Sequence, residues 1–110
     1  MVVTGAFRLM LSTAPADAAR ALARALVEEG LAACVSVVDG ARSVYSWKGA
    51  VCDDAESLLL IKTTAANAAG LAARLTELHP YEVPELVSLE IRSDEGNPDY
   101  LSWLAACVEK

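Results

Sequence analysis

Two alanine-rich helical patterns, each flanked by apolar segments of strand type, constrain the fold of this 110-residue chain more than any other feature. The first covers residues 13–30, with Thr13 expected as its N-cap and Gly30 as its C-terminal stop. The second covers residues 64–79 and ends before Pro80, which cannot continue a helix. Because apolar residues recur at helical spacing in both, each helix is expected to bury one face.

Five segments are expected to form strands because they are apolar, β-branched or alternating: residues 7–13, 31–38, 41–51, 56–63 and 84–91. The Asp-Gly pair at positions 39–40 predicts the turn of a hairpin between the second and third of them. The following "CDDAE" is interpreted as an exposed loop that carries Cys52. In the last strand, Val87, Leu89 and Ile91 are expected to point inward.

A short C-terminal helix is expected after the turn-rich "RSDEGNPD". Asn97 is a suitable cap and Pro98 suits the first helical position, where its missing N–H costs little. Tyr100 and Trp103, three positions apart, are expected to dock this helix onto the sheet.

The order of these elements favours an α+β fold of the ferredoxin-like, split βαβ type, in which both long helices cover one face of an antiparallel sheet. Residues 1–110 fit a single domain. A chain this small with 55% hydrophobic residues cannot bury all of that surface alone. The apolar face that the helices leave open therefore predicts an oligomer.

Charge and cysteine content exclude several classes of function. The net charge is −6 and no run of Lys or Arg is present, so nucleic-acid binding is not expected. No apolar run approaches the roughly 18 residues of a membrane span, and the N-terminus does not resemble a signal peptide. Three cysteines without CxxC spacing argue against a disulfide framework and a structural zinc site. The sequence predicts a cytoplasmic protein without membrane contact.

Six short motifs occur in order at the spacing of a known family: "STAP", "LAACVSVV", "RSVYSWKG", "LLLIKT", "LHPYEVPE" and "PDYLSWL". Together they resemble the CutA family of divalent-cation tolerance proteins over residues 7–104. "HPYEVPE" and "LAAC" followed by a Y-x-W-x-G hairpin are the specific parts. The resemblance implies a homotrimer with a ferredoxin-like fold, a long hairpin and a short C-terminal helix.

The resemblance also implies a function in the response to metal ions through binding of a divalent cation, with copper first. The alternative is a scaffold or signalling trimer of the PII type that binds a small molecule or a protein between its subunits. No enzymatic activity is implied, and the sequence offers no nucleophile elbow and no phosphate-binding glycine loop.

The metal prediction depends on His79, the only histidine. The resemblance implies copper ligands at three positions, which are Ser12, Leu78 and His79 in this chain. Copper(I) prefers thiolate, and serine does not replace it. The other interpretation is that His79 finishes a helix and serves no ligand. Binding of Cu²⁺ by His79 alone is expected to be weak unless a trimer axis or nearby carboxylates, with Glu82 and Glu85 as the obvious ones, complete the site.

Four further residues are candidates for a cleft between subunits. Tyr45 and Trp47 alternate onto one face of a strand, where they could line a ligand cleft or cover a neighbouring subunit. Lys62 is the one basic group in a strongly apolar strand. It either extends its ammonium group to solvent or pairs with a carboxylate such as Glu85 across a subunit contact, and the pair is the preferred hypothesis.

Overall fold

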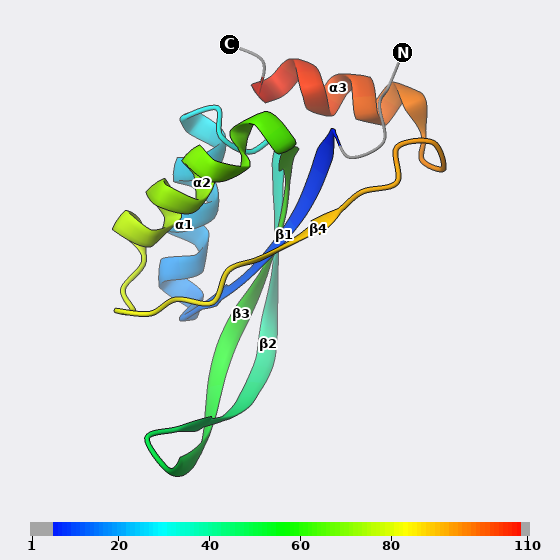
Figure 1. The fold of residues 1–110 in the computed structure, drawn as a ribbon. Coiled ribbons are helices and arrows are strands. Elements are labelled where there is room, and N and C mark those ends of the chain that lie inside the picture. The colour runs from blue at the N-terminus through cyan, green and yellow to red at the C-terminus, as the bar shows by residue number, and fades with distance from the viewer. Residues whose placement is uncertain (1–5, 109–110) are drawn as a thin grey trace.

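The computed structural model describes residues 6–108 (Figure 1). Its elements, in chain order, are β1 (Phe7–Ala14), α1 (Ala16–Glu28), β2 (Cys34–Trp47), β3 (Ala50–Thr64), α2 (Ala65–Leu78), β4 (Val87–Glu90) and α3 (Pro98–Val108). Among the residues described, no helix has the length and apolarity that crossing a membrane requires.

The four strands form one antiparallel sheet in the order β2-β3-β1-β4. The two outer strands, β2 and β4, each follow one of the long helices, and the two central strands, β1 and β3, precede them, as two βαβ units joined by a hairpin produce. Helices α1 and α2 lie side by side on one face of the sheet (Figure 1). The predicted α+β class is therefore confirmed.

The main core lies between the sheet and the two long helices. Met10, Leu59 and Ile61 on the helix side of the sheet pack with Leu26 and Leu75 from the helices. A second cluster lies under α3 and contains Phe7, Ala33, Leu101, Leu104 and Val108. The prediction that Tyr100 and Trp103 dock this helix is only partly correct: Leu101, Leu104 and Val108 anchor it, and both aromatics remain partly exposed, although the Tyr100 ring lies 5.7 Å from Lys62 Nζ on the sheet.

The predicted hairpin turn at positions 39–40 was wrong. Strand β2 continues through these residues with a register shift between Val38 and Ala41, and the turn comes later, at Lys48 and Gly49. Both turn residues have positive φ, 50° and 82°, as a two-residue type I′ hairpin requires. The Asp-Gly pair marks a β-bulge, where glycine supplies the positive φ just as it does in a turn.

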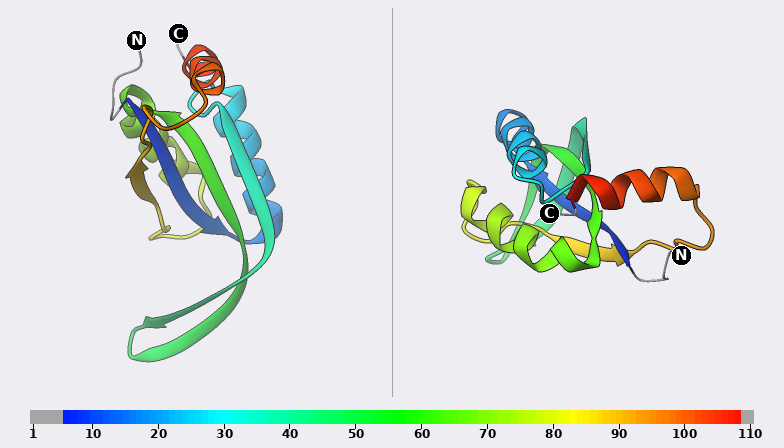
Figure 2. Two further views of the ribbon diagram at one scale, coloured as in Figure 1. Left: turned by 90° about the vertical axis from the view of Figure 1, so that its right-hand side faces the viewer. Right: turned by 90° about the horizontal axis from the view of Figure 1, so that it is seen from above.

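The bulge separates the body of the sheet from a two-stranded arm, residues 41–56, that projects beyond the rest of the molecule (Figure 2, left). The described chain is accordingly elongated, with extents of 48 × 26 × 22 Å. Cys52, expected in a loop, lies in this arm within β3. The predicted second strand and most of the predicted third are thus one strand, β2, and the end of the predicted third strand joins the fourth in β3.

Further element boundaries differ from the prediction. Helix α1 begins at Ala16 and not after Thr13, because Thr13 and Ala14 still pair with β3. Strand β4 covers only Val87–Glu90. The predicted cap of α3 is confirmed, since the Asp99 N–H donates to Asn97 Oδ1 at 3.0 Å.

The sheet face opposite α1 and α2 is open and apolar; it faces the viewer in Figure 2, left. Directly paired residues project to the same face, so the register assigns Leu9, Leu89 and Lys62 to it, with Leu11, Leu60 and Val87 in the next row. Val87 and Leu89 were expected inward but are 49% and 48% exposed in the single chain. We call this surface the open face.

Candidate functional site

His79 follows the last residue of α2 and is buried against the end of β1. Its Nε2 lies 2.8 Å from the carbonyl oxygen of Thr13, and its Nδ1 accepts the N–H of Tyr81 at 3.0 Å. A carbonyl can only accept a hydrogen bond and a backbone N–H can only donate one. In this arrangement Nε2 therefore carries the ring proton and Nδ1 carries none. Both nitrogens therefore have protein partners, and the ring joins the chain after α2 to β1.

Tyr81 extends this connection to the base of the arm. Its hydroxyl donates to Glu56 Oε2 at 2.8 Å, and its ring lies 4.8 Å from the His79 ring between centroids. Burial and then the Glu56 carboxylate raise the pKa of Tyr81 to about 12. Glu56 is itself buried beyond the last residue pair of β1. We refer to His79, Tyr81 and Glu56 as the arm-base cluster.

The same face of the arm continues outward from Glu56 to Asp54, Cys52 and Tyr45. The Tyr45 hydroxyl donates to Asp54 Oδ2, and this hydrogen bond is the main cause that raises the pKa of Tyr45. Asp53 projects to the opposite face, where it pairs with Arg42 at 3.0 Å. Asp53 and Asp54, although adjacent in the sequence, thus make their contacts on opposite faces of the arm.

The residues of one chain do not fit the copper site that the resemblance implied. Ser12 is fully buried and its hydroxyl donates to the Glu85 carbonyl at 2.7 Å, while Leu78 is an exposed aliphatic side chain. His79 must give up a hydrogen bond before either nitrogen can ligate a cation. Within residues 6–108, no three His, Cys, Asp or Glu side chains are grouped so that they could hold a metal ion. His79 as a metal ligand stays a prediction.

Lys62 lies on the open face near α3. Its Nζ donates to Cys34 Sγ, its cross-strand neighbour, at 3.9 Å and lies 5.7 Å from the centroid of the Tyr100 ring. Tyr100 and Trp103 form a tilted pair with ring centroids 5.4 Å apart. The lysine thus meets a sulfur and an aromatic surface within its own chain.

The four cleft candidates do not meet within one chain. Tyr45 and Trp47 share a face near the arm tip, as expected, and are 42% and 51% exposed. Lys62 lies ten positions from the Tyr45 partner Cys52 along β3, on the order of 30 Å at about 3.3 Å per residue. A cleft containing all of them would require the arm of one subunit to reach the body of another.

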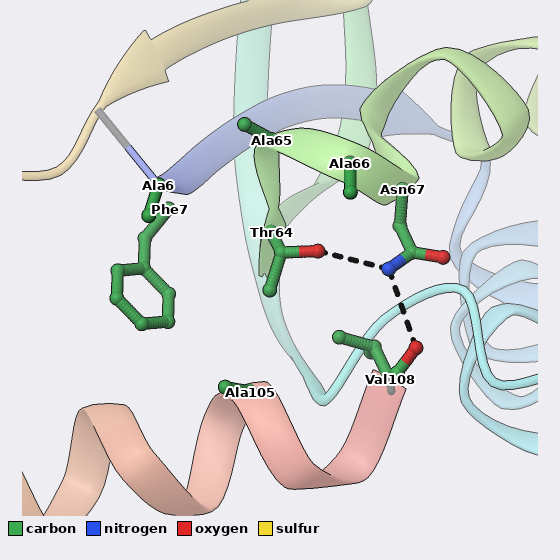
Figure 3. A pocket seen from close by; sticks show the side chains of 8 residues that line it. All are labelled: Ala6, Phe7, Thr64, Ala65, Ala66, Asn67, Ala105 and Val108. Atoms are coloured by element: carbon green, nitrogen blue, oxygen red, sulfur yellow. Dashed lines mark hydrogen bonds between the residues drawn. The ribbon is translucent and has the colours of Figure 1, made fainter. Parts of the chain in front are cut away.

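A surface pocket at the start of α2 has few polar groups that could bind a ligand (Figure 3). Alanines, Phe7 and Val108 supply most of its lining, and no charged side chain contributes. The Asn67 amide group donates to Thr64 Oγ1 at 2.8 Å and to the Val108 carbonyl at 3.3 Å. Because these bonds join α2 to α3, Asn67 has a structural role.

The arrangement of elements and motifs is shared with known proteins. The model of the CutA1 divalent ion tolerance protein family matches residues 8–107. The chain belongs to the CutA1 family. The divalent-cation tolerance protein CutA of Thermus thermophilus is 52% identical over 97 residues, covering 87% of this chain and 92% of the relative. The Xenopus laevis CutA homolog is 43% identical over 96% of this chain and 70% of its own length.

Solved structures of CutA1 proteins have the same fold. The Thermus thermophilus protein superposes with a TM-score of 0.86 at 50% identity, covering 91% of this chain and 96% of that one. A protein described as PII-like, CutA from Nostoc sp. PCC 7120, superposes with a TM-score of 0.88 at 35% identity, covering 93% and 97%. CutA1 proteins carry the name of tolerance proteins and not that of an enzyme.

Sequence reasoning missed the partners of the residues it selected. Glu56 and Tyr81 are 25 positions apart and share no periodic pattern, so nothing in the sequence pointed to their contact. The contact between Cys34 and Lys62 had a signal. Both lie in strands expected to be buried, and a correct hairpin register would have placed them side by side.

Proposed function

We propose that the protein serves divalent-cation tolerance as a homotrimeric binding protein and not as an enzyme. The observation that carries this proposal is the open face, where Leu9, Leu89 and Val87 are left partly exposed on a sheet whose other face packs against the two long helices. Apolar sheet surface of this kind is normally covered by a partner. Membership of the CutA1 family supports the link to cation tolerance.

The shape of the chain supports assembly as well. Strand β4 lies at the edge of the sheet with unpaired backbone groups, and the arm extends well beyond its own body. An arm that packed on another subunit would bury Val44, Trp47 and Val51, which are exposed in the single chain. Assembly would also bring the arm of one subunit toward Lys62 of another.

Copper is the first cation to test, and His79 is the first residue. His79→Gln is the matched variant, because the glutamine amide can still donate to Thr13 and accept from Tyr81 but offers no imidazole. We expect Cu²⁺ to bind the wild-type trimer and to bind His79→Gln about tenfold or more weakly. Calorimetric titration at one protein concentration measures both. Equal affinity in the two proteins would remove His79 from the site.

The second candidate function is that of a signalling or scaffold trimer of the PII type, with its ligand between subunits. The similarity to the PII-like protein from Nostoc sp. favours it. Binding of a small molecule by the trimer with no response to copper would favour this candidate over the first.

We further propose a cytoplasmic location. Cys34, Cys52 and Cys107 are all free thiols, which suits a reducing compartment. Fractionation of cells that express the protein tests it, and recovery in an oxidising compartment would contradict it.

A further inference from the structure

Lys62 carries a half-buried charge that no carboxylate among residues 6–108 neutralises. Five arginines each have an Asp or Glu oxygen within 4.0 Å: Arg20, Arg24, Arg42, Arg74 and Arg92. Within residues 6–108, Lys62 has no such partner, although the chain has six more acidic than basic residues. A lysine partly withdrawn from water without an anion is unfavourable unless something supplies the negative charge.

The two contacts of Lys62 hold the ammonium group in place without neutralising it. The Cys34 sulfur is a weak acceptor, and the Tyr100 ring offers a cation–π attraction that leaves the positive charge intact. The residue paired with Lys62 on β1, Leu9, is apolar, and so is Leu89, which pairs with Leu9 from β4. A charge in such surroundings is weakly screened and attracts an anion more strongly than a fully hydrated lysine does.

Next to this charge lies an aromatic surface. The rings of Tyr100 and Trp103 are 39% and 47% exposed, although the helix that carries them is anchored through Leu101 and Leu104 on its buried face. The core of α3 therefore does not require these aromatics. A cation beside two exposed rings matches a ligand with a carboxylate at one end and a planar apolar body.

We propose that Lys62, Tyr100 and Trp103, with Cys34 beside the ammonium group, form a binding site for a small organic carboxylate that has a planar apolar body. Lys62 binds the carboxylate, and the two rings contact the body of the ligand. The site is distinct from the arm-base cluster and needs no metal ion. This proposal specifies the ligand class for the second candidate function, a trimer of the PII type, and it rests on that function.

Benzoate is the probe, and benzamide is its neutral control of nearly the same shape. In NMR titrations of the full-length protein we expect benzoate to shift the indole N–H of Trp103, which a Trp47→Phe variant assigns. We expect a dissociation constant in the millimolar range and about tenfold weaker binding in Lys62→Met, as loss of a hydrogen bond to a charged group predicts. Lys62→Arg should retain binding, and Lys48→Met, at the exposed hairpin turn, should not change it.

Three results would overturn the proposal. They are equal shifts with benzamide, unchanged affinity in Lys62→Met, and no response of Trp103 to benzoate. A Glu85→Gln variant tests whether a carboxylate from a second copy of the chain occupies the site. Benzoate binding that appears only in this variant would assign Lys62 to a subunit contact and would also overturn the proposal. Native mass measured on the same samples separates these outcomes from a failure to assemble.

Discussion

Asp39 occupies the bulge where β2 leaves the body of the sheet, and two side chains hold it there. The buried Ser57 hydroxyl donates to one carboxylate oxygen at 2.6 Å, and Arg20 pairs with the other at 2.6 Å. The Ser57 hydrogen bond is the main cause that lowers the pKa of Asp39. These contacts fix a residue that the sequence suggested for a tight turn.

The Ser57→Ala variant should raise the pKa of Asp39 toward its ordinary value, because the strongest hydrogen bond to the carboxylate is lost. A lowered pKa in the folded state stabilises the fold above the pKa of the unfolded state, and this stabilisation disappears as the pH falls through the folded pKa. The Ser57→Ala variant should therefore have less of this pH-dependent stabilisation than the wild-type protein. Carboxyl NMR titration measures the change, Ser46→Ala is the exposed control, and an unmoved Asp39 titration in Ser57→Ala would contradict the assignment.

Tyr81 should titrate near pH 12, and Glu56→Gln should lower this pKa without returning it to the usual value of about 10. Burial is the larger cause of the shift and persists in the variant, whereas the negative charge does not. Because the folded pKa is raised, the associated stabilisation is complete below about pH 10 and is lost as the pH rises toward 12. Tyrosinate absorbance, compared with Tyr81→Phe, measures it. A rise in pKa in Glu56→Gln would contradict the arm-base cluster.

At this scale the sequence predicted where His79 lies but not what it contacts. Its place after α2 and before Pro80 followed from helix periodicity and the proline. Its partners, Thr13 and the Tyr81 amide, depend on how the chain after α2 crosses the end of β1, which no local pattern encodes. The ligand prediction rested on residue type alone.

Substitution by alanine should change the stability of the protein in opposite directions at two glycines, one in the hairpin turn and one in a helix. Gly49 has φ of 82° in the hairpin turn, where a side chain is strained even though nothing lies within 4 Å of the added Cβ. Gly70 lies inside α2, and its added Cβ would make an ordinary contact of 3.6 Å with Leu31. We expect Gly49→Ala to destabilise the protein by about 1 kcal/mol.

Gly70→Ala should instead stabilise it by about 0.5–1 kcal/mol, since alanine favours the helix and the space is available. Denaturant unfolding of both variants at one protein concentration measures the two values. Stabilisation by Gly49→Ala would contradict the position of the hairpin turn.

The elements themselves were largely predictable from the sequence. Helical spacing of alanine and leucine located α1 and α2, and Asn97 with Pro98 located the start of α3. The arm was not predictable, because the Asp39-Gly40 pair is a strong turn signal. That this pair forms a bulge instead depends on contacts with the distant Ser57 and Arg20. Lys48-Gly49 is a weaker signal, since lysine rarely adopts positive φ.

For the whole molecule, the open face is the feature that the single chain leaves unexplained. A carboxylate in place of one of its apolar side chains should prevent assembly. We expect Leu89→Asp to abolish the trimer, because it would bury an unpaired carboxylate in an apolar contact. Val27→Asp is the matched control: Val27 is 43% exposed and lies on α1, away from the open face. Loss of assembly in Val27→Asp with retention in Leu89→Asp would place the contact elsewhere.

The molar mass of the wild-type protein in solution tests the central claim most directly, namely that copies of this chain cover one another's open faces. Size-exclusion chromatography with multi-angle light scattering at micromolar concentration measures it without reference to any ligand. The account predicts a single species with three times the mass of the 11.6 kDa chain. A folded species with the mass of one chain would contradict it.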